Sequence, residues 1–149
     1  MQLAFRHHRT NTFNIDGNYM IGKKNMVFGF AYFITTLLLG IYMVVMEENP
    51  GFEGSEAEEM MRVAHAHGNL ESVLNIIIGY LLCRLAIGSG LAQTISILLL
   101  VGAVFHSGMI YLGSMGFEAA MKLAPIGALS LVAVMVLMTY AVATTREIK

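Results

Sequence analysis

Polar side chains that can bind a metal ion or move a proton cluster near the middle of the chain. The segment AHAHGNLESVLN, residues 64–75, contains five of them: His65, His67, Asn69, Glu71 and Asn75. Between residues 63 and 83, Glu71 is the sole Asp, Glu, Lys or Arg. Ionisable residues in such apolar segments are costly in a membrane and are usually kept for function. The segment is therefore the first place to expect a functional site.

Helical spacing divides these side chains into two stripes. His67, Glu71 and Asn75 are four residues apart and share one face of a helix. Three further polar residues lie on roughly the opposite side: His65, Asn69 and Ser72. We expect one stripe to face the interior of the protein and the other to face a neighbouring subunit or a flat cofactor. A Glu with a His one turn away suits metal binding or proton transfer.

The elements that position these residues are predicted from the distribution of charge. Of 149 residues, 56% are hydrophobic and 13% are charged, whereas soluble domains average about 25% charged. A membrane-spanning helix needs about 20 apolar residues, and four segments qualify: residues 25–46, 63–85, 91–113 and 123–145. Spanning segments must be helical, and short loops make neighbours antiparallel. The sequence predicts an all-α polytopic membrane protein, an antiparallel four-helix transmembrane bundle.

Loop charges predict the orientation. Basic residues concentrate in the N-terminal segment, at Arg84 and in the tail, whereas the first loop is acidic. By the positive-inside rule, both termini are cytoplasmic in an inner (cytoplasmic) membrane. The sequence therefore predicts a cytoplasmic N-terminal segment (residues 1–24), a four-helix transmembrane domain (25–145) and a cytoplasmic tail (146–149). A net charge of −1 argues against a nucleic-acid partner, and a single cysteine excludes an intrachain disulfide.

The third predicted helix contributes His106 and Tyr111. At the rise of an α-helix, Glu71 lies roughly 12 Å below the start of its helix and His106 roughly 10 Å below the end of its own. The two side chains therefore meet at similar depth in the outer half of the bilayer, with Asn75 below them. Candidate catalytic residues are Glu71, His106, Tyr111 and Asn75. Candidate metal ligands are His65, His67, Glu71 and His106.

These residues resemble a family of small four-helix membrane isomerases, styrene oxide isomerase and hydroxylaminobenzene mutase. Its pattern is an Ala-His pair at the start of helix two, an Asn six residues later and another Asn in helix three. Here the pair is Ala64-His65 after Arg62, and Glu71 follows six residues on. The segments GAVFHSGMIYLGS (102–114), KLAPIGALSL (122–131) and GFE (51–53) resemble other parts of the family. The likeness extends over residues 25–140.

The resemblance implies a specific chemistry. His65 would bind the iron of a heme b lodged between the subunits of a trimer. The ferric iron would act as a Lewis acid and open an epoxide to an aldehyde. Glu71 and His106 would take the places of the two family asparagines. His67 remains the alternative iron ligand, and a heme suits apolar walls in the first and fourth helices.

The chain departs from this family at the positions that do its chemistry. An acid and an imidazole replace the two asparagines, and the family's catalytic Tyr falls on Ile110, beside Tyr111. A competing alignment of LESVLN (70–75) with the mutase pattern puts Asn69, a second candidate cofactor-binding residue, where the ligand His belongs. The heme-binding fold therefore carries over better than the isomerase chemistry.

A second likeness points to another metal. HAHGNLE is similar to a stretch of heme–copper oxidase and nitric-oxide reductase catalytic subunits, where a His and a Glu four residues apart hold a non-heme metal beside a heme. The corresponding residues are His67 and Glu71, with His106 as a possible third ligand. The favoured hypothesis is a heme isomerase whose substrate is a small apolar molecule from the bilayer, such as an aromatic epoxide. A redox or gas-handling protein with a second metal ion, and a non-enzymatic subunit of a larger membrane complex, are the alternatives.

Overall fold

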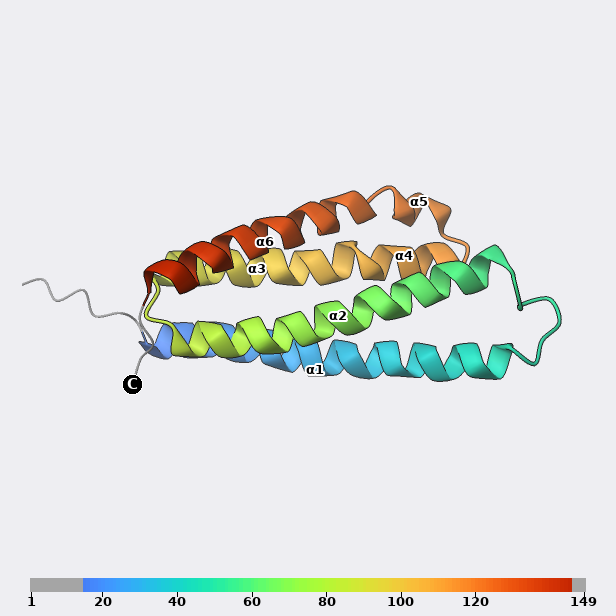
Figure 1. Cartoon of the computed structure of the whole chain (residues 1–149), viewed down its shortest axis with the longest axis horizontal. Helices are drawn as coiled ribbons and strands as arrows, with labels where there is room; N and C mark the ends of the chain where they lie inside the picture. Colours follow the sequence, from blue (N-terminus) through green and yellow to red (C-terminus); the bar gives the residue numbers. More distant parts are fainter. Residues whose placement is uncertain (1–14, 146–149) are drawn as a thin grey trace, which may run out of the picture.

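The computed structural model describes residues 15–145, and this part of the chain contains helices and no strand. The helices are α1 (Ile15–Met46), α2 (Glu56–Arg84), α3 (Ser89–Phe105), α4 (Ser107–Ser114), α5 (Glu118–Met121) and α6 (Ala124–Thr144). Figure 1 shows the long helices lying lengthwise beside one another, with α4 continuing the line of α3. The predicted all-α bundle is confirmed.

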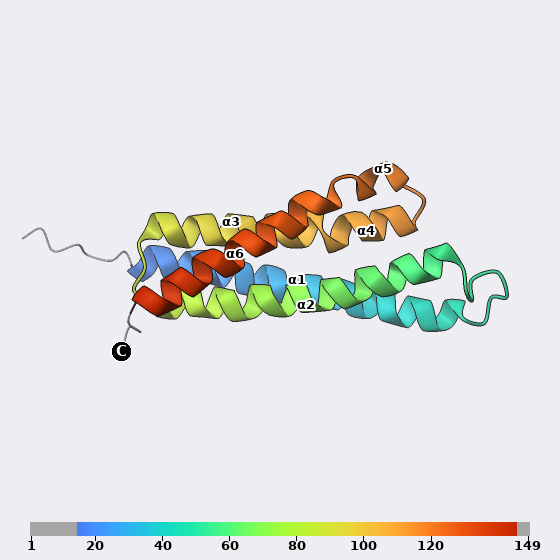
Figure 2. The same cartoon turned by 45° about the horizontal axis from the view of Figure 1, so that its top comes forward.

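The bundle consists of two packed pairs of helices. α1 packs along α2, α6 packs along α3, and α4 joins the pairs by packing against α2. In Figure 2, α6 crosses α3 obliquely. Ile15 and Thr145 bound the described part of the chain, and both lie at the end of the bundle where α2 connects to α3 (Figure 1). The α1–α2 loop and α5 lie at the opposite end.

Within residues 15–145, three segments are long and apolar enough to cross a membrane: Gly17–Met46, Ser89–Ser114 and Glu118–Thr144. Their outer faces carry many exposed large hydrophobic side chains, which suit lipid rather than water. The apolar helices therefore indicate a membrane protein. α2 is not among these segments, because its histidines, asparagines and acids lower its hydropathy. It forms the fourth long helix of the bundle, so the second predicted span lies within a longer, more polar helix.

α1 begins ten residues before the predicted span, at Ile15 rather than at residue 25. Its first turns are helical because they dock onto the bundle. The Asn18 amide donates to the carbonyl of Ile87 at 2.8 Å. Gly22 lies against α2 so closely that an added Cβ would overlap the carbonyl oxygen of Gly79. Residues 15–24, predicted as part of a polar terminal segment, are therefore part of the bundle.

α2 also begins before its predicted span, at Glu56 rather than at residue 63. Ser55 caps the helix by accepting a hydrogen bond from the Glu58 backbone at 3.2 Å. The Glu58 carboxylate reaches back to the backbone N–H of Gly54 at 2.7 Å, and acidic residues in the first turn suit the helix dipole. The acidic segment predicted as loop thus forms the first two turns of α2.

The core of the bundle is apolar at one end and increasingly polar towards its middle. Near the α2–α3 connection, a cluster that includes Leu82, Ile95, Leu99 and Val134 is almost fully buried. Towards the middle, the fully buried Asn25 donates to Asn75 at 3.1 Å and accepts from the Ser96 hydroxyl. This network links α1, α2 and α3 directly below the candidate site.

Candidate metal centre

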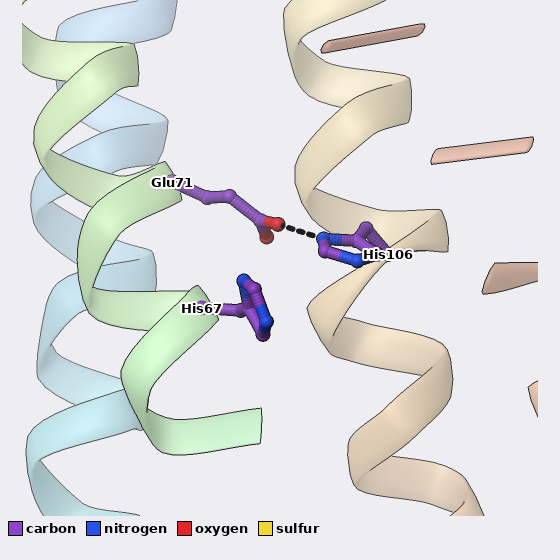
Figure 3. Close-up of side chains that lie close together, drawn as sticks. All are labelled: His67, Glu71 and His106. Carbon is purple, nitrogen blue, oxygen red and sulfur yellow. Dashed lines mark hydrogen bonds and ion pairs between the residues drawn. The ribbon is translucent and has the colours of Figure 1, made fainter. Parts of the chain in front are cut away.

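Glu71 of α2 and His106 of the α3–α4 junction meet between the two helices. The Nδ1 atom of His106 lies 2.6 Å from Oε1 of Glu71, and Figure 3 shows both side chains reaching into the gap between their ribbons. The Glu71 side chain is 1% exposed and that of His106 is 19% exposed. The predicted meeting of these residues at one depth is confirmed.

The second carboxylate oxygen of Glu71 also has a hydrogen-bond partner. The Ser107 hydroxyl donates to Oε2 of Glu71, and the Tyr32 hydroxyl lies 2.7 Å from Ser107 Oγ. Because a carboxylate accepts hydrogen bonds, Ser107 donates to Glu71 and accepts from Tyr32. A buried charge in a membrane is tolerated when it is paired and hydrogen-bonded. The carboxylate therefore has a partner at each oxygen.

His67 completes a group of three possible metal ligands. It lies one turn before Glu71 on α2, and its ring meets the His106 ring edge to face, with centroids 4.6 Å apart. One ligand atom from each of His67, Glu71 and His106 lies within 4.8 Å of the others. Figure 3 shows all three side chains converging on the same space. Two imidazoles and a carboxylate are a ligand set used by catalytic zinc and non-heme iron.

The hydrogen bond from His106 determines which of its nitrogens faces a metal. Since Nδ1 donates to Glu71, Nε2 carries the free lone pair. Carboxylate–histidine–metal arrangements use this pattern, in which the acid orients the imidazole. The group can therefore bind a metal through His67 and Nε2 of His106 with Glu71 behind, or through Glu71 directly after a small rotation of His106.

A break in the helix at His106 sets the direction of its side chain. His106 has φ −88° and ψ −85°, outside the α-helical region, and separates α3 from α4. Gly127 of α6 packs directly on this break. The carbonyl oxygen of Ala103 lies 3.3 Å from the Tyr32 hydroxyl and 3.2 Å from Ser107 Oγ, as an alternative acceptor for either hydroxyl. The predicted third span was continuous, and this contact with α6 explains why the helix is divided.

His65 and Asn69 face α1 rather than a neighbouring subunit. His65 Nδ1 lies 2.8 Å from the carbonyl oxygen of Thr36, and its Nε2 lies 3.0 Å from the Asn69 amide nitrogen. Asn69 accepts from the Thr36 hydroxyl at 2.6 Å. An added Cβ on Gly40 would come within 2.7 Å of the His65 ring. α1 therefore packs against this stripe, and the expectation of another subunit or a flat cofactor beside it stays a prediction.

The two remaining candidates lie beside the group of three. Asn75 donates to the backbone carbonyl of Glu71 at 2.9 Å and accepts from Asn25, so its amide is used within the bundle. Tyr111 lies on α4, 39% exposed, and its hydroxyl has no hydrogen-bond partner between residues 15 and 145. Neither side chain is among the grouped metal ligands.

Two residues of the site were not predicted from the sequence, Tyr32 and Ser107. Ser107 follows His106 directly, and a hydroxyl in a charge-free span was a usable signal. Tyr32 lies far away in the sequence, in an apolar helix that also holds other aromatic residues. Its contact with Ser107 depends on how α1 packs against α4, which no local pattern specifies.

The chain belongs to the family described as a domain of unknown function (DUF8059), whose model matches residues 21–149. This match includes every residue of the candidate site. No curated protein and no solved structure is significantly similar to the chain. The resemblance to membrane isomerases therefore stays a prediction from the motifs alone.

Proposed function

We propose that this protein is a membrane-embedded metalloprotein that binds one divalent transition-metal ion at His67, Glu71 and His106. The proposal is supported above all by the convergence of three ligand atoms within 4.8 Å from two helices of an apolar bundle. Three protein ligands leave a coordination position open. The function is then the activation of a small molecule at that position, through Lewis-acid or redox chemistry of the metal.

The ligand types favour zinc or ferrous iron. Imidazole suits Zn, Cu, Fe and Ni, whereas Mg and Ca prefer oxygen ligands throughout. The nearby acceptors and donors also support a metal role for the histidines. The Ser107 hydroxyl donates to Glu71 and thereby orients the carboxylate, and such supporting partners commonly accompany metal ligands.

Heme b ligation by His65 has less support from the contacts. Both ring nitrogens of His65 lie within hydrogen-bonding distance of protein atoms, and α1 packs over the ring. An iron at Nε2 must displace Asn69 and open the α1–α2 contact. The isomerase activity, the trimer and the aromatic epoxide substrate implied by the resemblance stay predictions that depend on this ligation.

The orientation of the bundle is part of the proposal. Lys23 and Lys24 lie early in α1 and Arg84 ends α2, so all three lie towards the end where α2 connects to α3. The acidic residues 47–59 lie in the α1–α2 loop and at the start of α2, at the other end (Figure 1). The positive-inside rule then assigns the first end to the cytoplasm of a cytoplasmic membrane. Glu71 lies near the middle of α2, and a depth in the outer half of the bilayer stays a prediction.

The test is metal binding by the purified full-length protein. We expect one Zn²⁺ or Fe²⁺ per chain by elemental analysis. Co²⁺ added to metal-free protein should give visible d–d bands. His67→Ala should weaken Co²⁺ binding by about 100-fold or more, since mutating even a supporting partner of a metal ligand costs 10–100-fold. Wild-type protein that takes up no metal would overturn the proposal and favour the non-enzymatic subunit.

His65→Ala is the matched control, because it removes the same side chain two residues away on the same helix. Its Co²⁺ affinity should stay within about threefold of wild type, as expected for a residue outside the ligand set. Circular dichroism and size-exclusion chromatography of both variants establish that each is folded. A Soret band that disappears in His65→Ala and persists in His67→Ala would instead support the heme hypothesis.

A further inference from the structure

A small cavity is lined in part by Ser107, the residue that donates a hydrogen bond to Glu71. It has a volume of about 100 Å³ and is enclosed by α1, α2 and α4. Ser107 and Thr36 lie at its buried side, with the exposed Thr35 and Tyr111 at its mouth. Because this mouth lies along apolar helices rather than at a loop, it opens towards the bilayer.

The lining of this cavity is unusually rich in hydroxyl groups for an apolar bundle. Most are already used: Thr35 and Thr36 donate to backbone carbonyls or to Asn69, and Tyr32 pairs with Ser107. The Tyr111 hydroxyl differs, because no described residue lies within hydrogen-bonding distance of it. A phenol without a partner at the mouth of a cavity offers one O–H donor to a bound molecule.

The volume limits what can bind. A cavity that holds benzene measures about 150 Å³, and one water molecule takes about 30 Å³ of the liquid. The present cavity therefore accommodates roughly three to five non-hydrogen atoms. A charged molecule would bind poorly, because none of the lining residues is Asp, Glu, Lys, Arg or His, so its charge would have no partner of opposite sign.

We propose that this cavity binds a small uncharged molecule with an oxygen acceptor, smaller than benzene, that arrives from the bilayer. The Tyr111 hydroxyl donates to the acceptor oxygen, and the apolar wall at Leu39 and Ala64 contacts the remainder. Aromatic epoxides exceed this volume, so the inference narrows the substrate class suggested by the motifs. The proposal that the cavity binds this molecule depends on the cavity and on Tyr111, and it does not depend on the metal centre.

A link to the metal rests on the proposed function. Tyr32 lines the cavity, its hydroxyl contacts Ser107, and Ser107 donates to Glu71. These two contacts form a chain of hydroxyl groups that connects the cavity to Glu71. If the metal centre is as proposed, the cavity holds the substrate beside the metal ligands.

Gly108 offers a way to fill the cavity without disturbing the fold. Gly108 lines the cavity, and an added Cβ would lie 3.6 Å from both the Tyr32 hydroxyl and the Ala103 carbonyl oxygen. These are ordinary van der Waals distances, so Gly108→Ala places a methyl group in the space the ligand needs. Gly90→Ala is the matched control, because Gly90 is also helical and an added Cβ there meets nothing within 4 Å.

The experiment measures binding of acetone to the full-length protein in lipid nanodiscs by saturation-transfer NMR, with empty nanodiscs as the blank. Wild type and Gly90→Ala should bind acetone equally, and Gly108→Ala should bind at least about tenfold more weakly, as an overfilled site does. Tyr111→Phe should weaken binding about fivefold through loss of one hydrogen bond, whereas Tyr80→Phe, an exposed tyrosine on α2, should not. Acetophenone should fail to compete.

Each other outcome overturns the inference. No acetone signal in wild type, equal binding by Gly108→Ala and Gly90→Ala, or competition by acetophenone would each contradict the cavity as the site. The Co²⁺ titration on the same samples separates the two proposals. Intact metal binding without acetone binding overturns the cavity alone, and acetone binding without metal binding overturns the metal centre alone.

Discussion

Gly127 of α6 lies against the backbone nitrogen of His106, at the residue where α3 gives way to α4. An added Cβ on Gly127 would overlap this nitrogen and the Phe105 carbonyl carbon. The contact connects α6, which contributes no residue to the group of His67, Glu71 and His106, to the backbone of His106. α6 therefore positions the imidazole of His106 through the backbone rather than through a side chain.

Gly127→Ala should destabilise the protein and displace His106. Overfilling of a packed interface typically costs about 1–3 kcal/mol, and here the overlapping atoms are backbone. The free energy of unfolding can be measured by detergent denaturation, together with Co²⁺ affinity. Gly90→Ala is the control and should be neutral or stabilising by up to about 1 kcal/mol. An unchanged Co²⁺ affinity in Gly127→Ala would contradict the positioning role of α6.

Glu71→Leu should destabilise the bundle far more than Glu71→Gln. The leucine leaves the His106 N–H without its acceptor and leaves the Ser107 hydroxyl only the Ala103 carbonyl oxygen, and breaking a buried pair in this way costs about 3–5 kcal/mol. Glutamine keeps one acceptor oxygen and a similar shape, so its cost should be smaller. Detergent unfolding measures both. Glu59→Gln, at an exposed acid on the same helix, should shift stability by less than about 0.5 kcal/mol.

Asn25 and Asn75 should be energetically coupled. Their side chains are hydrogen-bonded at 3.1 Å between α1 and α2, and such bonds between membrane helices average about 0.6 kcal/mol in double-mutant cycles, with values up to about 1.7. The cycle uses Asn25→Ala, Asn75→Ala and the double variant. The control pairs Asn25→Ala with Thr139→Ala, on an exposed face of α6, which should be additive. A coupling of zero for the asparagine pair would exclude a stabilising network.

Ser55→Ala should weaken the start of α2. Loss of an N-cap hydroxyl typically costs about 1 kcal/mol, and Ser55 accepts from the Glu58 backbone. Amide hydrogen exchange should show faster exchange confined to the first turn of α2, with overall stability lowered by the same amount. Ser89→Ala provides the comparison, because the cap of α3 is Gly88 and no side chain caps that helix. Equal effects of the two variants would contradict the capping role.

Several parts of the fold and site follow from local pattern. Stretches free of charge marked the first, third and fourth spans, because lipid excludes charge regardless of how helices pack. The four-residue spacing of His67 and Glu71 placed them on one face of a helix. The matching depth of Glu71 and His106 followed from counting residues in antiparallel helices, and their contact is confirmed at 2.6 Å.

Other parts depended on contacts between distant segments. The early start of α1 follows from docking of Asn18 and Gly22 onto the α2–α3 end of the bundle, which hydropathy does not report. The division of the third span at His106 follows from the approach of Gly127. Helical spacing predicts that His65 and Asn69 lie on a different face from His67. It does not predict which helix packs against that face, and in the structure this helix is α1.

Residue type and spacing alone thus determined an apolar helical bundle with an acid and an imidazole at one depth, since these follow from the solvent and from helix geometry. The tertiary structure decided that His67 groups with Glu71 and His106, whereas His65 contacts Thr36 of α1 and Asn69. It also brought Ser107 to the second oxygen of Glu71 and Tyr32 to Ser107. These outcomes depend on the rotation and approach of whole helices, which are set by packing over the full interface and are not encoded in any single segment.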